Sequence, residues 1–143
     1  MHNQAAAQFD SITATLVEGE KKRLEMLPKY FGMRYMLRAE GLVYGWMGKL
    51  CPNYRGAYWN YFELSNGGFF MAPSGIDTYD LVCQGAQCTV HVGGTAAGII
   101  ATLYMLNQLA NTTRQDSFCQ LYRYLLEYAR EHAEWKQIRT AID

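Results

Sequence analysis

The sequence predicts an α+β fold in which an antiparallel sheet of two hairpins, with or without an added N-terminal edge strand, packs with about four to five helices. Two features of the chain support this prediction. Residues 58–92 alternate apolar and polar side chains around two glycine-containing turns. The segments before and after them repeat apolar residues at helical spacing. The order of helices, then strands, then helices is typical of an antiparallel sheet.

The length and composition indicate one globular domain. The chain has 143 residues, of which 50% are hydrophobic and 18% charged, below the roughly 25% that is usual for charged residues. This balance argues against intrinsic disorder. We expect residues 1–14 to form a mobile N-terminus and residues 15–143 to form a single domain.

The cysteine content and the apolar runs favour a cytoplasmic protein. The longest apolar run, around residues 96–106, is too short to cross a bilayer. The first ten residues, MHNQAAAQFD, have neither a basic region nor an apolar core of a signal peptide. Four cysteines are too few for a disulfide framework in a chain of this length. We therefore expect reduced thiols and no membrane partner.

Three segments precede the hairpins. Ser11–Val17 is rich in β-branched residues and is expected to add an edge strand. Lys21–Leu27 is expected to be a short helix that Pro28 ends. Met33–Leu50 has a helical period, with one apolar face and with glycines at i, i+4 and i+7 on a second face. These glycines predict a smooth strip against which another element packs, or a break near Gly41.

The first hairpin spans YWNYFELSNGGFFMAP, residues 58–73. Its Asn66-Gly67 pair is expected to form a two-residue type I′ turn. That register puts four apolar side chains on the core face, namely Phe62, Leu64, Phe69 and Met71. The other face is amphipathic and carries Trp59, Tyr61, Glu63 and Phe70.

The density of aromatic rings in this hairpin has two explanations. Rings that stack on single-stranded nucleic acid need cations beside them to follow the phosphates. Residues 56–113, however, contain no Lys or Arg. We therefore expect the rings to pack beneath a helix or against a partner protein.

The second hairpin, YDLVCQGAQCTVHV, is expected to turn at Gly85-Ala86 in a type II′ turn. Its alternation puts both cysteines on the core face and places His91 opposite Asp80 on the solvent face as an ion pair. The following helix, from Thr95 to about residue 110, is apolar almost all round and should be buried. A last helical region begins near residue 116 with an apolar stripe that residues 135 and 138 extend.

Two motifs resemble chemical sites, and we interpret both as structural. Cys83-x4-Cys88-x2-His91 does not match a zinc spacing, and the pleat points the histidine away from the thiols. HVGGTAAG, residues 91–98, lacks the spacing of a phosphate-binding loop, so its glycines turn the chain and Thr95 caps the helix. We expect no cofactor, no metal and no enzymatic activity.

The net charge is zero, with 13 basic and 13 acidic residues. An acidic DNA mimic and a strongly basic nucleic-acid-binding protein are both disfavoured. Residues 21–55 nevertheless hold eight bases and two acids. This segment is a solvated helix face or a docking patch for an acidic partner. The alternative function is a small nucleic-acid-binding module that uses this basic segment.

The block GLVYGWMGKLCPNYRGAYWNYFELSNGGFFMAP, residues 41–73, resembles the signature of the ArdB/KlcA antirestriction family. AAGIIATLYMLNQLA (96–110) and the terminal RTAID (139–143) are similar to the family as well. The resemblance covers roughly residues 15–143, so that segment is expected to be a single antirestriction domain. Ala57 stands where the family usually has glycine.

The resemblance implies a non-enzymatic inhibitor, carried by plasmids and genomic islands, that alleviates DNA restriction by type I restriction–modification systems. Its partner would be that machinery or an associated host factor, contacted directly or indirectly, without DNA mimicry or strong nucleic-acid binding. We expect a monomer or a weak homodimer. The contact residues that we propose from the resemblance are Trp59, Tyr61, Arg139 and Asp143.

Overall fold

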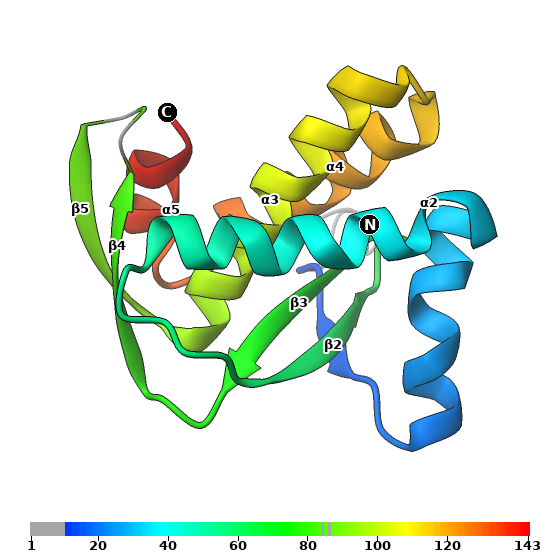
Figure 1. The fold of residues 1–143 in the computed structure, drawn as a ribbon, viewed down its shortest axis with the longest axis horizontal. Helices are drawn as coiled ribbons and strands as arrows, with labels where there is room; N and C mark the ends of the chain where they lie inside the picture. Colours follow the sequence, from blue (N-terminus) through cyan, green and yellow to red (C-terminus); the bar gives the residue numbers. More distant parts are fainter. Residues whose placement is uncertain (1–10, 84, 86) are drawn as a thin grey trace, which may run out of the picture.

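The computed structural model describes residues 11–83, 85 and 87–143. This part of the chain contains four helices and five strands in two antiparallel sheets, which confirms the α+β class (Figure 1). The elements are β1 (Ala14–Leu16), α2 (Glu20–Leu50), β2 (Tyr58–Leu64), β3 (Phe69–Ser74), β4 (Thr78–Cys83), β5 (Cys88–Gly93), α3 (Gly94–Thr113), α4 (Asp116–Arg130) and α5 (Trp135–Ile142). The predicted edge strand is present as β1, but the two hairpins belong to separate sheets, β1-β2-β3 and β4-β5.

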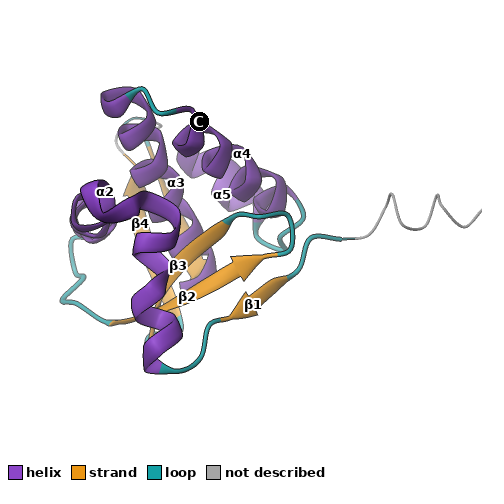
Figure 2. Ribbon diagram, turned by 90° about the vertical axis from the view of Figure 1, so that its right-hand side faces the viewer, coloured by secondary structure: helices purple, strands orange, loops and turns teal. Residues whose placement is uncertain are grey.

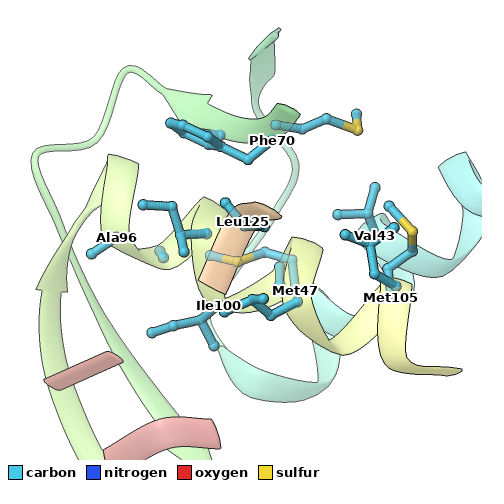
Figure 3. Close-up of a cluster of buried hydrophobic side chains, with 14 of the residues drawn as sticks. Val43, Met47, Phe70, Ala96, Ile100, Met105 and Leu125 are labelled. Atoms are coloured by element: carbon cyan, nitrogen blue, oxygen red, sulfur yellow. The ribbon is translucent and has the colours of Figure 1, made fainter. Parts of the chain in front are cut away.

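Helix α3 lies at the centre of the molecule, as its apolar sequence predicts. It packs between α2 on one side and α4 on the other, and it also contacts β3 and α5 (Figure 2). Figure 3 shows the core around it, with Val43 and Met47 from α2, Phe70 from β3, Ala96, Ile100 and Met105 from α3, and Leu125 from α4. Because α3 touches both sheets, it joins two hairpins that share no hydrogen-bonded strand pair.

Helix α2 consists of two arms that meet at Gly32, and Figure 1 shows them at a wide angle to each other. The expectation that Pro28 ends a short helix is wrong, because Pro28 lies inside the first arm. The break falls at Gly32, whose φ of 71° and ψ of 169° belong to a backbone region that almost only glycine occupies. The second arm buries Ala39, Val43, Met47 and Leu50, the apolar face that the periodicity predicts.

The three glycines of the second arm face outward. A Cβ atom at Gly41, Gly45 or Gly48 would meet nothing within 4 Å, and all three residues are exposed. The predicted close packing on this strip and the alternative break near Gly41 are therefore both wrong. Helical spacing identifies a shared face, but it does not tell which way that face points.

The register of the first hairpin differs by one residue from the prediction. Phe62 pairs with Phe70 and Tyr61 with Met71, and the Leu64 amide donates to the Gly68 carbonyl at 2.9 Å. The connection is therefore a three-residue loop instead of a two-residue turn. β3 is buried on both faces, and in this register Phe70 lies opposite Phe62 and stacks between the rings of Phe62 and Tyr128.

The second hairpin has the predicted register, with Asp80 opposite His91 and Cys83 opposite Cys88. Its predicted type II′ turn includes residue 86, which lies outside the described residues. The predicted mobile N-terminus also falls mostly outside them, at residues 1–10. Thr13, within that predicted segment, hydrogen-bonds to Ser65 through both its amide and its carbonyl. Among the described residues, no helix combines the length and apolarity that a membrane crossing requires.

Candidate functional site

Trp59 and Tyr61, two of the predicted contact residues, lie in the core with 4% and 7% of their surface exposed. The indole Nε1–H of Trp59 donates to the hydroxyl of Tyr54 at 2.7 Å, and the Tyr44 ring lies 5.4 Å away. Burial first of all, and then nearby Tyr61, Glu40 and Tyr54, raise the pKa of Tyr44 to about 12. The expectation that the rings of this hairpin pack beneath a helix is confirmed for these two side chains, which leave little surface for a partner.

Arg23 covers this aromatic cluster from the first arm of α2. Its guanidinium donates to the Trp59 carbonyl at 2.8 Å and lies over the rings of Tyr58 and Tyr61, at 4.6 and 5.1 Å from their centroids. Tyr58 is the exposed member, with 62% of its surface accessible. The arginine thus fixes β2 to α2 by a charge-assisted hydrogen bond and two cation–π contacts.

Arg139 and Asp143, the other predicted contact residues, lie on the exposed side of α5. Their side chains approach to 3.7 Å, Nε to Oδ2, one helical turn apart. About 70% of each side chain is open to solvent, so the pair adds little to stability. Both groups are available to a partner.

The structure separates the cysteines from the histidine of the second hairpin. Cys83 is buried, and burial raises the pKa of its thiol to about 11, which disfavours the reactive thiolate. His91 points to the opposite side, where its Nδ1 lies 2.6 Å from Asp80 Oδ1 in an exposed pair. Among the described residues, no group of three His, Cys, Asp or Glu side chains is placed to hold a metal ion.

Gly93 and Gly94, where β5 meets α3, contact other residues of the protein and leave no space for a phosphate. The Gly93 amide donates to both carboxylate oxygens of Glu134, at 3.3 and 3.1 Å, next to the positive end of the helix dipole. A Cβ atom at Gly94 would come within 2.9 Å of the Pro73 carbonyl oxygen. Close packing explains this motif, and Thr95 lies within the helix instead of capping it, because the N-cap position is Gly93.

The basic residues of 21–55 spread over both arms of α2 and the loop that follows. Lys29 pairs with Glu63 at 2.6 Å, and hydrogen bonds from Lys29 and Tyr30 hold the pKa of that carboxyl below its usual value. Arg38 reaches Thr112 of α3 at 3.2 Å. The cations are spread along both arms of α2 and lie over separate rings, such as Tyr58, Tyr35 and Trp46, and only Tyr61 among these rings is buried. In the described part of the chain, rings and cations are therefore dispersed and do not form one continuous row along which a single strand could stack.

Sequence reasoning missed a cavity of about 420 Å³ at the C-terminal end of α2. Trp46, Lys49 and Leu50 of α2 line it together with Tyr104 of α3 and Val82 of β4. Its walls come from three segments that are well separated in the chain, so only the folded structure brings them together. Cavities of this size and apolar character are typical of ligand sites and of anchor sites for side chains.

These features define a small α+β domain whose accessible parts are helix faces, exposed ion pairs and an apolar cavity. A family model described as antirestriction protein matches residues 52–143. Two relatives from Escherichia coli are each called antirestriction protein KlcA. One is 42% identical over 140 residues, covering 95% of this chain and 98% of the relative. The other is 46% identical over 138 residues, covering 92% and 94%.

A solved structure agrees with this similarity. It comes from work stating that the KlcA and ArdB proteins show a novel fold and antirestriction activity against type I DNA restriction systems in vivo but not in vitro. It is 43% identical, has a TM-score of 0.86, and the match covers 94% of this chain and 96% of that one. The chain therefore belongs to the antirestriction protein family.

Proposed function

We propose that this protein alleviates the restriction of DNA by type I restriction–modification systems inside the cell. The observation that carries the proposal is the similarity to the KlcA and ArdB structure, which extends over 94% of the chain at a TM-score of 0.86. At 43% identity, the likeness is one of sequence as well as of fold. Because the activity stated for those proteins occurs in vivo but not in vitro, the protein acts on the restriction machinery or through a host factor present in the cell.

The mechanism that we propose is protein contact without chemistry. The buried thiol of Cys83 and the exposed imidazole of His91 lie on opposite faces of their hairpin, so neither can activate the other. The amide of Gly93, just before α3, donates to the carboxylate of Glu134, in the place where a phosphate-binding loop would bind a phosphate. Of the predicted contact residues, Arg139 and Asp143 remain candidates because both are exposed.

DNA mimicry is disfavoured by charge. A mimic of the DNA backbone needs a dense array of carboxylates, whereas this chain balances 13 acidic against 13 basic residues. The few ion pairs of the described residues are exposed and scattered over α2, β4-β5 and α5. Recognition by shape and by local charge fits this surface better than long-range electrostatic imitation.

Phage plating tests the proposal. Unmodified phage is plated on a host with an active type I system, with and without expression of this protein, and modified phage serves as the control for growth. We expect expression to raise plating of the unmodified phage toward that of the modified phage. Unchanged restriction, with the folded protein present in the cells, would overturn the proposed function.

A further inference from the structure

The cavity at the end of α2 presents apolar ring surface because its polar atoms bond elsewhere. The Trp46 Nε1–H donates to Gln108 Oε1 at 2.9 Å, and the Tyr104 hydroxyl donates to the Ala141 carbonyl at 2.6 Å. The two rings stack with centroids 4.7 Å apart. With their hydrogen bonds satisfied inside the protein, both rings are positioned to contact an apolar group.

Val82 adds an accessible apolar wall to the cavity. It lies on the outer face of β4 with 38% of its surface exposed, while its neighbours Leu81 and Cys83 point into the core. The free energy of the system falls when an apolar group displaces water from such a wall. The cavity is therefore both open and apolar.

Lys49 gives the cavity a positive charge. Its ammonium lies 4.9 Å from the Trp46 ring centroid, and it makes no ion pair with a carboxylate of the described residues. Lys49 is the one charged side chain among the described residues that line the cavity, so the charge there is positive although the protein as a whole is neutral.

We propose that this cavity is the anchor site for a partner protein, and that it takes an apolar side chain from an acidic segment of that partner. A carboxylate beside the apolar side chain pairs with Lys49, and burial of the side chain against Trp46, Tyr104 and Val82 supplies the affinity. The inference rests on the proposed function, because it names the surface through which the contact is made.

Charge complementarity favours this occupant over two others. A second copy that met the same cavity across a twofold axis would bring Lys49 close to its own counterpart. Nucleic acid needs a series of cations that follows its phosphates, whereas Lys49 is the one cation among the described residues that line the cavity. An acidic segment with an apolar side chain matches both the charge and the walls.

Site-specific photocrosslinking in restricting cells tests the inference. The crosslinker p-benzoylphenylalanine replaces Val82 in one variant and Thr15 in a control. Thr15 is exposed on a strand of the other sheet, β1, and does not line the cavity. We expect a protein adduct at position 82 that is absent at position 15, with the crosslinked peptide of the partner rich in Asp and Glu.

Charge variants make this result specific. Lys49→Glu should lower the adduct yield and the protection of unmodified phage by about tenfold, whereas Lys49→Arg should preserve both. Lys21→Glu, the same charge reversal on the exposed first arm of α2, should change neither. Melting curves and circular dichroism establish that each variant is folded.

Several outcomes would overturn the inference while the proposed function stands. They are a crosslink of the chain to itself or to DNA, an adduct that Lys49→Glu leaves unchanged, and the absence of any adduct at position 82 in cells that are still protected. Failure of the unsubstituted protein to protect phage would instead overturn the proposed function, and the inference with it.

Discussion

The hydroxyl oxygen of Thr102 lies 3.2 Å from the amide nitrogen of Met71 and 3.3 Å from its carbonyl oxygen. Thr102 is fully buried on α3, and Met71 lies on β3, the edge strand of the three-stranded sheet. The Tyr61 carbonyl, in the residue opposite Met71, accepts from Val17 on the other side of β2. The polar groups of Met71 therefore point away from the sheet, and one threonine satisfies both.

Thr102→Val keeps the shape of the side chain and removes both hydrogen bonds. Because the Met71 amide and carbonyl would then be buried without partners, we expect the free energy of unfolding to fall by about 1–3 kcal/mol. Urea denaturation measures this change. Thr102→Ser, which keeps the hydroxyl, should lose less. Equal stability of Thr102→Val and the unsubstituted protein would show that this contact does not hold α3 to the sheet.

Gly98 lets α3 approach the same strand. A Cβ atom there would overlap the Met71 carbonyl oxygen and the Ala72 Cα, both of them backbone atoms that cannot move aside. We expect Gly98→Ala to destabilise the protein by about 1–3 kcal/mol or more, as overpacking does. Gly45→Ala is the matched control, because its Cβ meets nothing within 4 Å, and it should stabilise the helix by about 0.5–1 kcal/mol. Opposite signs of the two changes in thermal melting are the predicted result.

His132 should make stability depend on pH. Burial lowers the pKa of its imidazole, with Glu134 opposing the effect, and the neutral ring accepts a hydrogen bond from the Glu134 amide at 3.0 Å. The unfolded chain then binds the proton more tightly than the folded protein does, so stability falls as the pH drops below about 6.5. His132→Asn should flatten the unfolding free energy between about pH 7 and pH 5. An unchanged slope would contradict the assignment.

Part of the fold follows from local patterns in the sequence. The second hairpin has the predicted register, with Asp80 opposite His91, and its strict alternation excludes a one-residue shift because that shift would turn the apolar face toward solvent. The observed register of the first hairpin differs from the predicted one by one residue, because Gly67-Gly68 allows both a two-residue and a three-residue connection. A distant contact accompanies the observed loop, in which the Asn66 side-chain amide donates to the Tyr124 carbonyl of α4 at 2.9 Å. Local turn rules cannot include that bond.

The candidate site was less predictable than the fold. Burial of Trp59 and Tyr61 depends on how α2 crosses the sheet, which the break at Gly32 decides. The cavity at the end of α2 needs Trp46 and Val82 side by side, and no local signal links them. Lys49 belongs to the basic segment 21–55, for which the sequence allows either a solvated helix face or a docking patch for an acidic partner. Its position beside an apolar cavity appears only in the structure.

Binding of nucleic acid should be weak. The chain is neutral, and the burial of Trp59, Tyr61 and Phe70 removes the rings of the first hairpin as a surface on which the bases of single-stranded DNA could stack. We expect no shift of single-stranded or duplex DNA in a gel assay at low salt, where electrostatic binding is strongest. Retention that weakens steeply as salt is added would support the basic segment 21–55 as a DNA-binding surface instead.

The most direct test of the central claim, that a surface and not a reactive group alleviates restriction, is phage plating with a double variant. Cys88→Ala with His91→Ala removes the accessible thiol and imidazole of the second hairpin. Our account predicts that restricting cells expressing this variant protect unmodified phage as well as cells expressing the unsubstituted protein. Loss of protection by the folded double variant would contradict the account and point to chemistry at this hairpin.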